Sequence, residues 1–329
     1  MNFNLNRDMN IMKKTFLRCL ATLTTAVLMT SQAFAWPDKP IEIVVGFAPG
    51  GGTDITARTL AVYLEKELGG PVVVVNKPGA SGAIGLAFVA KSKPDGYTLG
   101  MTNMPGLLTL PIERDAGFKP SDFTYLANIV KDPSAFSVSI NQPYQNIAEL
   151  IAAAKKEPGK ISYGSTGVGT DDHLALVFFE KVTGTELNHV PYNGAGPLRN
   201  AVIGGHTVVG GMNLGEAMPY NGKNVRILAQ SSDKRSPLAP DVPTFRELGV
   251  DLIMASERGI VGPKGLPADV QKKLTDALAK VAANPEFLDK IKAQFTEIDF
   301  VAGAQWEQRL SKDEKAFRDM WAKQPWVKP

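Results

Sequence analysis

The chain has 329 residues, 44% of them hydrophobic, with 36 Lys and Arg against 33 Asp and Glu and a single Cys. This composition excludes a disordered chain, a collagen-like chain and a disulfide-stapled scaffold, and it indicates an ordinary globular protein of about two domains. The net charge of +3 lies in the first 35 residues, which hold four basic side chains and one acidic one, and the other 294 residues balance 32 against 32. Because these 294 residues carry no net charge, the composition gives no indication of a nucleic-acid partner.

Residues 1–35 have the layout of a secretory signal peptide. Basic residues from Lys13 to Arg18 precede an apolar stretch from Cys19 to Met29, and Ala33-Phe34-Ala35 then matches the signal for cleavage after Ala35. A membrane anchor is the alternative, but the apolar run has about 11 residues against the roughly 20 that a bilayer requires. Cys19 lies at the start of that run, whereas a lipidated cysteine is expected after it. We therefore predict export to the periplasm and a mature chain with neither disulfide nor thiol nucleophile.

From Trp36 onward, short β-branched runs alternate with amphipathic stretches of helical length, a pattern typical of α/β layers with a largely parallel sheet. The all-valine run 72–75 predicts a strand that is buried on both faces rather than an edge strand. No linker separates two parts, and we expect two lobes facing each other across a cleft, lobe 1 at 36–136 plus 260–329 and lobe 2 at 137–259. We expect strands at 41–45, 72–75, 97–100, 136–140, 161–163 and 225–229, and helices at 55–68, 84–89, 147–156, 171–182, from 267 and around 306–317.

Three glycine-bearing loops, 47–54, 76–82 and 164–170, each follow a predicted strand and precede a predicted helix. Free backbone N–H groups and the positive end of the helix dipole favour an anion at such a position. Glycine allows close approach, and the loops add hydroxyl donors from Thr53, Ser81, Ser165, Thr166 and Thr170. Four or five charge-assisted hydrogen bonds of roughly 1.5–3 kcal/mol each can hold a carboxylate at micromolar affinity. The alternative is that these residues only cap helices and form turns.

The same loops do not match the motifs of enzymes. Gly46 to Gly51 has the first gap of a phosphate-binding loop but no Lys follows, and the dinucleotide fingerprint fails at Ile55. Both Gly-x-Ser-x-Gly candidates are interrupted, at Ala83 and at Tyr163. The three histidines, His173, His189 and His206, are 16 and 17 residues apart, which is not a metal-ligand spacing. We therefore predict that the protein is not an enzyme and holds neither a metal nor a cofactor. Two interpretations of the histidines stay open: one of them acts as a general base, or each imidazole makes one ordinary hydrogen bond.

Seven short segments follow one another along the mature chain: WPDKPI at 36–41, VGFAPGGGTD at 45–54, VNKPGASG at 75–82, PDGYTL at 94–99, HVPYNGAGP at 189–197, DVPT at 241–244 and GLPA at 265–268. In this order they resemble the Bug, or TctC-type, solute receptors of tripartite tricarboxylate transporters. The resemblance implies a two-lobe periplasmic binding protein of type II, a Venus flytrap in which each lobe is a mainly parallel sheet flanked by helices. It also implies a monomer that closes on a small carboxylic acid and delivers it to the membrane subunits of the transporter.

Such receptors hold one carboxylate with backbone amides, small hydroxyls and bridging waters from the three loops. Carried over by position, the resemblance implies a ligand-binding set in this chain of Ala48, Pro49, Gly50, Gly51, Gly52, Thr53, Asp54, Gly79, Ala80, Ser81, Gly82, Thr102, Asn103, Ser165, Thr166, Gly167, Val168, Gly169, Thr170, Asp171, His173, Tyr192 and Asn193.

The chain departs from the family pattern at Gly211-Met212, where the family often has Phe-Asp. Asp171 and Asp172 directly follow the middle loop, and two interpretations remain: they complement the helix dipole from its first turn, or one of them binds a cationic group of the ligand, as in an amino acid. Two other functions stay open. One is an exported enzyme acting on an acidic substrate with His173 or the Asp pair as base, and the other is a sensor that signals to a membrane protein.

Overall fold

The computed structural model describes residues 36–327. The chain divides into two units, Met1–Asp38 and Lys39–Pro329, and every helix and strand described below belongs to the second unit, which is described by itself. The predicted signal peptide and its cleavage site lie outside the described residues. Among residues 36–327, none of the helices combines the length and the apolar character that a membrane crossing requires.

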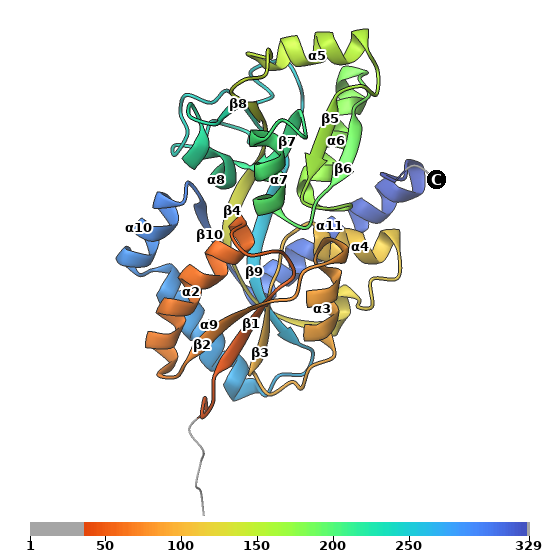
Figure 1. Ribbon diagram of the computed structural model, residues 1–329. Coiled ribbons are helices and arrows are strands. Elements are labelled where there is room, and N and C mark those ends of the chain that lie inside the picture. The colour runs from red at the N-terminus through yellow and green to blue at the C-terminus, as the bar shows by residue number, and fades with distance from the viewer. Residues whose placement is uncertain (1–35, 328–329) are drawn as a thin grey trace, which may run out of the picture. The chain divides into compact units, whose positions relative to one another are not determined.

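A continuous sheet organises the second unit (Figure 1). Its strand order is β2-β1-β3-β9-β4-β7-β5-β6, and β10 and β8 also pair with β4. The strands are β1 (Ile41–Val45), β2 (Val72–Asn76), β3 (Thr98–Met101), β4 (Phe123–Ser139), β5 (Ser162–Ser165), β6 (Asn188–Pro191), β7 (Val209–Asn213), β8 (Val225–Gln230), β9 (Ala255–Pro263) and β10 (Glu297–Ala302).

Helices begin where local residues can satisfy their first N–H groups. α5, for example, begins after Asn146, whose side chain accepts from the N–H of Glu149 at 2.9 Å, a common N-cap arrangement. The helices are α2 (Gly52–Leu68), α3 (Ala83–Ala90), α4 (Gly106–Glu113), α5 (Ile147–Lys156), α6 (Asp171–Thr183), α7 (Ala195–Ile203), α8 (Leu214–Ala217), α9 (Ala268–Ala282), α10 (Pro285–Ala293) and α11 (Gly303–Lys323), with 3₁₀ turns at Ala80–Gly82, Pro120–Asp122 and Met218–Tyr220.

The long strand β4 divides the sheet into two halves. Residues 123–133 of β4 pair with β9, whereas residues 134–139 pair with β7 and β8. We call β1, β2, β3, β9, β10 and residues 123–133 the first half, and β5 to β8 with residues 134–139 the second half. Each half has its own buried core, one around Trp306 and Val261 and another around Phe136 and Phe179.

The predicted α/β fold class is confirmed. Parallel pairing holds for β1 with β2 and β3, and for β5 with β6 and β7, while β4 and β9 pair antiparallel with their neighbours. The prediction that the valine run is buried on both faces is wrong. β2 is an edge strand against which α2 packs, and its residues from Val73 on are exposed or half-buried. β-branched residues suit any pleated, half-buried surface, so the run did not distinguish a central strand from an edge strand.

Gly259 in β9 is required by close packing. A Cβ at this position would collide with the Trp306 ring of α11 and would lie 2.6 Å from the carbonyl oxygen of Ala127. Because overpacking of this kind costs about 1–3 kcal/mol, we expect Gly259→Ala to lower the free energy of unfolding in urea by that amount. Gly106→Ala is the matched control, since its Cβ would meet nothing within 4 Å and alanine favours a helix start. Equal losses in the two variants would contradict the packing argument.

Candidate functional site

The three glycine loops lie together in the structure. The N–H of Ala48 donates to the carbonyl of Asn193 at 3.1 Å, which joins the first loop to the segment after β6. In the second and middle loops, Ser81 lies against Gly167 so closely that a Cβ on the glycine would come within 2.6 Å of Ser81 Oγ. Segments from both halves of the sheet therefore meet at one place, as the resemblance implied.

A buried carboxylate, Asp54, holds the first loop in shape. Its side chain accepts from the N–H of Gly50 at 2.9 Å, from Asn76 Nδ2 at 2.9 Å and from Arg58 Nε at 3.0 Å. Burial acts to raise the pKa of Asp54, but these hydrogen bonds and the Arg58 charge outweigh it and hold the pKa below its usual range. Asp54 is thus a residue that shapes the loop.

The first turn of α2 already contacts a carboxylate of the protein. The N–H of Gly52 donates to Glu216 Oε1 at 2.8 Å, and the other oxygen of Glu216 accepts from the N–H of Asn213 at 3.0 Å. Gly52 has no room for a side chain, because a Cβ would lie 2.6 Å from Arg258 Nη2 and 2.7 Å from Glu216 Oε1. The helix start does attract an anion, but in this structure the anion is Glu216 from the second half.

The second loop has an unusual backbone. All four residues from Gly79 to Gly82 have positive φ, including Ala80 at 48° and Ser81 at 60°. Non-glycine residues adopt this region at a cost of roughly 1–3 kcal/mol and cluster at functional sites. This conformation places Ser81 against the middle loop.

In the middle loop, several N–H groups have partners among nearby side chains. The N–H of Thr166 donates to Asp172 Oδ2 at 3.3 Å, that of Gly167 to Ser165 Oγ at 3.2 Å and that of Gly169 to His173 Nδ1 at 3.1 Å. The hydroxyls are also used internally, since Thr166 donates to Asp172 at 2.5 Å and Thr170 to the Gly167 carbonyl at 2.7 Å. Three amides of this loop therefore have partners within the protein, because short polar side chains of the same turn reach them.

The other residues of the implied set differ in whether their side chains lie at the loops. Asn103 Nδ2 lies 3.3 Å from Thr53 Oγ1 and so adjoins the first loop. The hydroxyl of Thr102 instead donates to the carbonyl of Gly259 at 3.2 Å and accepts from its N–H at 3.0 Å. The hydroxyl of Tyr192 is bonded to Thr207 at 2.6 Å. The hydroxyls of Thr102 and Tyr192 therefore serve the fold in this structure.

His173 is a buried, neutral imidazole. Its Nδ1 accepts from the N–H of Gly169, and its ring stacks on that of His189 with centroids 4.2 Å apart. Burial lowers the pKa of His173 to about 3, and the neighbouring His189 adds to this shift. With Val168 and Trp326, the two rings line a pocket of about 370 Å³. The ordinary interpretation of His173 agrees with these contacts.

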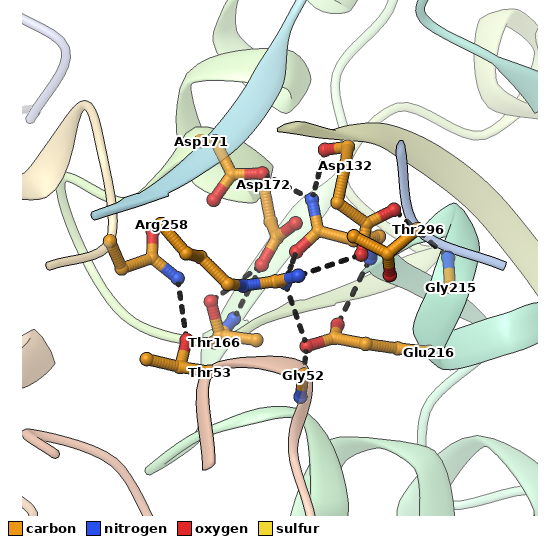
Figure 2. Close-up of polar contacts among 12 residues, drawn as sticks. Gly52, Thr53, Asp132, Thr166, Asp171, Asp172, Gly215, Glu216, Arg258 and Thr296 are labelled. Carbon is orange, nitrogen blue, oxygen red and sulfur yellow. Dashed lines mark hydrogen bonds and ion pairs between the residues drawn. The ribbon is translucent and has the colours of Figure 1, made fainter. Parts of the chain in front are cut away.

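A buried ion-pair network joins the two halves (Figure 2). Arg258 of β9 is fully buried, and its Nη1 donates to Asp132 Oδ2 of β4 at 2.9 Å. Its Nη2 donates to Asn213 Oδ1 at 2.8 Å and to Glu216 Oε1 at 3.3 Å, and both partners belong to the second half. Burial raises the pKa of Asp132 to about 7, although the Arg258 charge opposes this shift. A pocket of about 170 Å³ reaches Asp132, Glu216 and Gly52.

Asp171 and Asp172 begin α6 and are fully buried. Asp171 Oδ2 accepts from Ser134 Oγ and from Asn213 Nδ2, both at 2.7 Å, while Asp172 Oδ2 accepts from Thr166. The second oxygen of each carboxylate is buried without a hydrogen-bond partner. Burial raises the pKa of Asp171 to about 6 against the opposing hydrogen bonds, and burial together with the Asp171 charge raises the pKa of Asp172 well above its usual range.

The departure at Gly211 has a steric explanation. A Cβ there would collide with the Tyr163 hydroxyl, which donates to the backbone carbonyl of Asp172 at 2.9 Å. Met212 is fully buried in the core of the second half. Tyr163 therefore occupies the space beside Gly211 and supports the start of α6.

Four further residues at this place, Asp132, Asn213, Glu216 and Arg258, were not expected from the sequence. Only Asn213 and Glu216 carried a local signal, because their spacing is that of a capping box, which the structure shows at the start of α8. Nothing local indicated that Arg258 and Asp132 would meet, since 126 residues separate them along the chain. Within residues 36–327, no three His, Cys, Asp or Glu side chains are grouped so that they could hold a metal ion.

The comparison with known proteins agrees with the fold. The sequence profile of the TctC family, described as "Tripartite tricarboxylate transporter family receptor", matches residues 56–320. The chain belongs to this family. A curated TctC relative, the protein BugT of Bordetella pertussis, is 34% identical over 247 residues, which are 74% of this chain and 76% of BugT.

Two solved structures show how closely this TctC receptor follows known receptors. One, titled as a periplasmic transporter, is 34% identical with a TM-score of 0.83 and covers 88% of this chain and 98% of its own. Another, R. palustris Rpa4515 with adipate, is 30% identical with a TM-score of 0.81 and covers 88% of this chain and 96% of its own. The two-lobe periplasmic binding fold expected from the sequence is thereby confirmed.

Proposed function

We propose that this receptor is exported to the periplasm, binds a small carboxylic acid between its two halves and delivers it to the membrane subunits of a tripartite tricarboxylate transporter. The single observation that carries the proposal is the meeting of the three loops, with Ser81 of one half packed on Gly167 of the other. The adipate of the R. palustris relative supports a carboxylic acid as the ligand class.

The ligand contacts that we propose come from the residues of the implied set that meet there. They are 48–53 of the first loop, 79–82 of the second, Asn103, 165–170 of the middle loop and Asn193. Several amides of these loops have partners within the protein, so we propose that the remaining donors and bridging water hold the ligand carboxylate.

We propose that the two halves are the two lobes and that they hinge where β4 and β9 cross between them. The sheet pairing changes between residues 133 and 134 of β4, and β9 begins at Ala255. The lobe limits at 136 and 260 inferred from the sequence lie a few residues from these points. A ligand that contacts both halves favours the closed arrangement.

A thermal-shift panel of mono-, di- and tricarboxylic acids and acidic amino acids tests this function. A ligand present at 100 times its dissociation constant adds about 2.7 kcal/mol to the free energy of unfolding and raises the melting temperature. The bound acid should be recovered unchanged and in a ratio of one to one, which distinguishes a receptor from an enzyme. Flat melting curves across the whole panel would refute the proposal.

Ser81 provides a site-directed test. We expect Ser81→Ala to raise the dissociation constant of the best acid several-fold, because the loss of one hydrogen bond costs about 0.5–1.5 kcal/mol. Ser92→Ala is the control, since Ser92 Oγ donates to the carbonyl of Phe88 at 2.8 Å, away from the loops. Isothermal titration of both variants measures the difference, and equal dissociation constants would show that the second loop does not contact the ligand.

A further inference from the structure

We propose that α4 and the C-terminal tail, residues 324–327 after α11, form a latch that holds the two halves of the receptor together. The proposal rests on the two lobes of the proposed function and adds a device that sets how readily they open. The latch consists of Thr109 and Glu113 of α4, which lie against Gly169 of the middle loop, and of Trp326 of the tail, which holds Glu113 in place.

The helix α4 is built into the first half. Its residues Leu107, Leu108 and Leu110 lie in the buried core around Trp306 and Val261. The long helix α11 packs on α4 (Figure 1). The middle loop, in contrast, leads from β5 into α6 in the second half. A contact between α4 and the middle loop is therefore a contact between the two halves.

Thr109 makes such a contact. Its side chain is fully buried, and its hydroxyl donates to the carbonyl of Gly169 at 2.6 Å. The Pro105 carbonyl within α4 lies 3.3 Å from the same hydroxyl, which is longer than the usual range, so Gly169 is the main acceptor. The fit is close, because a Cβ on Gly169 would lie 3.0 Å from Leu110 Cδ2 and 3.2 Å from Glu113 Oε2. Separation of the halves would break this short hydrogen bond and expose the facing side of Leu110.

Trp326 holds the last turn of α4 in this position. It is 4% exposed, and its Nε1–H donates at 2.9 Å to Glu113 Oε2, the oxygen that faces Gly169. The other oxygen of Glu113 pairs with Arg114. Arg114 also donates to the carbonyl of Ala80 in the second loop at 3.1 Å. The tail and the second loop therefore fix Glu113 where α4 meets the middle loop.

Every donor and acceptor in these contacts belongs to the chain itself. The latch therefore acts in the ligand-free receptor, where it raises the population of the closed arrangement. A ligand that binds between the halves then has less closing free energy to supply, and its apparent affinity rises with the closed fraction. If the same contacts only stabilise the fold, their loss lowers the free energy of unfolding but leaves the separation of the halves unchanged.

Distances between the two halves of the ligand-free receptor test the latch. The chain has a single cysteine, Cys19, so in a Cys19→Ser background Lys91→Cys and Lys181→Cys place one spin label on an exposed position of each half. Double electron–electron resonance then measures the populations of the open and closed arrangements. We expect Thr109→Val to raise the ratio of open to closed receptor about two- to tenfold, because one hydrogen bond between the halves is lost.

Matched variants separate the latch from a loss of stability. Thr109→Ser keeps the hydroxyl and should keep the wild-type ratio. In Thr124→Val the lost hydrogen bond lies within the first half, since the Thr124 hydroxyl donates to the carbonyl of Pro263 at 3.1 Å, and the ratio should not change. Trp326→Phe keeps an aromatic ring but removes the donor to Glu113, and it should raise the ratio in the same direction as Thr109→Val. This second variant keeps the test available if Thr109→Val does not fold.

The outcomes distinguish the latch from the function on which it rests. A ratio that stays within about twofold of the wild type in both Thr109→Val and Trp326→Phe would overturn the latch. A shift in Thr124→Val as large as that in Thr109→Val would also overturn it. Because the measurement uses no ligand, neither result bears on the binding of an acid. Flat melting curves in the acid panel would refute the proposed function, whereas a shifted ratio would still support the latch.

Discussion

Arg258→Met is expected to lower the free energy of unfolding by about 3–5 kcal/mol, as measured by urea denaturation. Methionine fills a similar volume but leaves Asp132 and Glu216 buried without the guanidinium that now contacts both at 2.9 and 3.3 Å. An uncompensated buried carboxylate is more costly than a lost attraction, because its hydration is not recovered.

A triple variant distinguishes two causes of the lost stability, namely unpaired buried carboxylates and lost packing. Adding Asp132→Asn and Glu216→Gln to Arg258→Met removes the two carboxylates that the single substitution leaves unpaired. We expect this triple variant to recover more than half of the lost free energy of unfolding. Arg246→Met is the surface control, since Arg246 pairs with Asp233 and Asp251 in the solvent, and its unfolding midpoint should barely move. A single-variant loss below about 1 kcal/mol would show that the network is hydrated rather than buried.

The stability of the receptor is expected to depend on pH through Asp171. Burial raises the pKa of Asp171 to about 6 in the folded protein, against 3.8 for the ordinary side chain. The folded state therefore binds the proton more tightly than the unfolded state, and this contribution is present below about pH 4 and is lost as the pH rises through about 6.

Asp171→Asn removes this dependence, because asparagine does not titrate. The difference in unfolding free energy, variant minus wild type, should rise by roughly 2 kcal/mol between pH 4 and pH 7, because the full effect of about 1.4 kcal/mol per pKa unit is reached only at a pH below both pKa values. Urea denaturation at a series of pH values measures it, and Asp269→Asn should give a curve parallel to the wild type. A difference that falls with pH would mean that Asp171 is stabilised as a carboxylate, and the burial argument would be wrong.

The fold could be predicted well where one segment carries its own signal. The helix expected at 147–156 is observed with the same limits, and the strand at 41–45 likewise, because amphipathic period, caps and β-branched runs are local properties. β9 was missed although it borders both β3 and β4, because a strand with Arg258 inside it does not look buried until its partners are known.

The sequence indicated which loops to consider but not how their amides are hydrogen-bonded. Glycine after a strand indicated where the chain must turn sharply, and the loops that contain Ser81 and Gly167 do meet. Which amides stay free was not readable, because Asp172 and His173 reach the middle loop from the first turn of α6 only in the folded chain. The contacts of the ligand itself stay a prediction.

The sequence by itself determined the zero net charge of residues 36–329, the α/β class and the three loops, since charge, periodicity and glycine position are local properties of the sequence. Only the tertiary structure decided that Arg258, Asp132 and Glu216 form one buried network, and that Asp171 and Asp172 are fully buried. The physical reason is that burial and pairing depend on groups far apart in the chain, and a charge that is harmless in water becomes costly or useful only when the fold removes it from solvent.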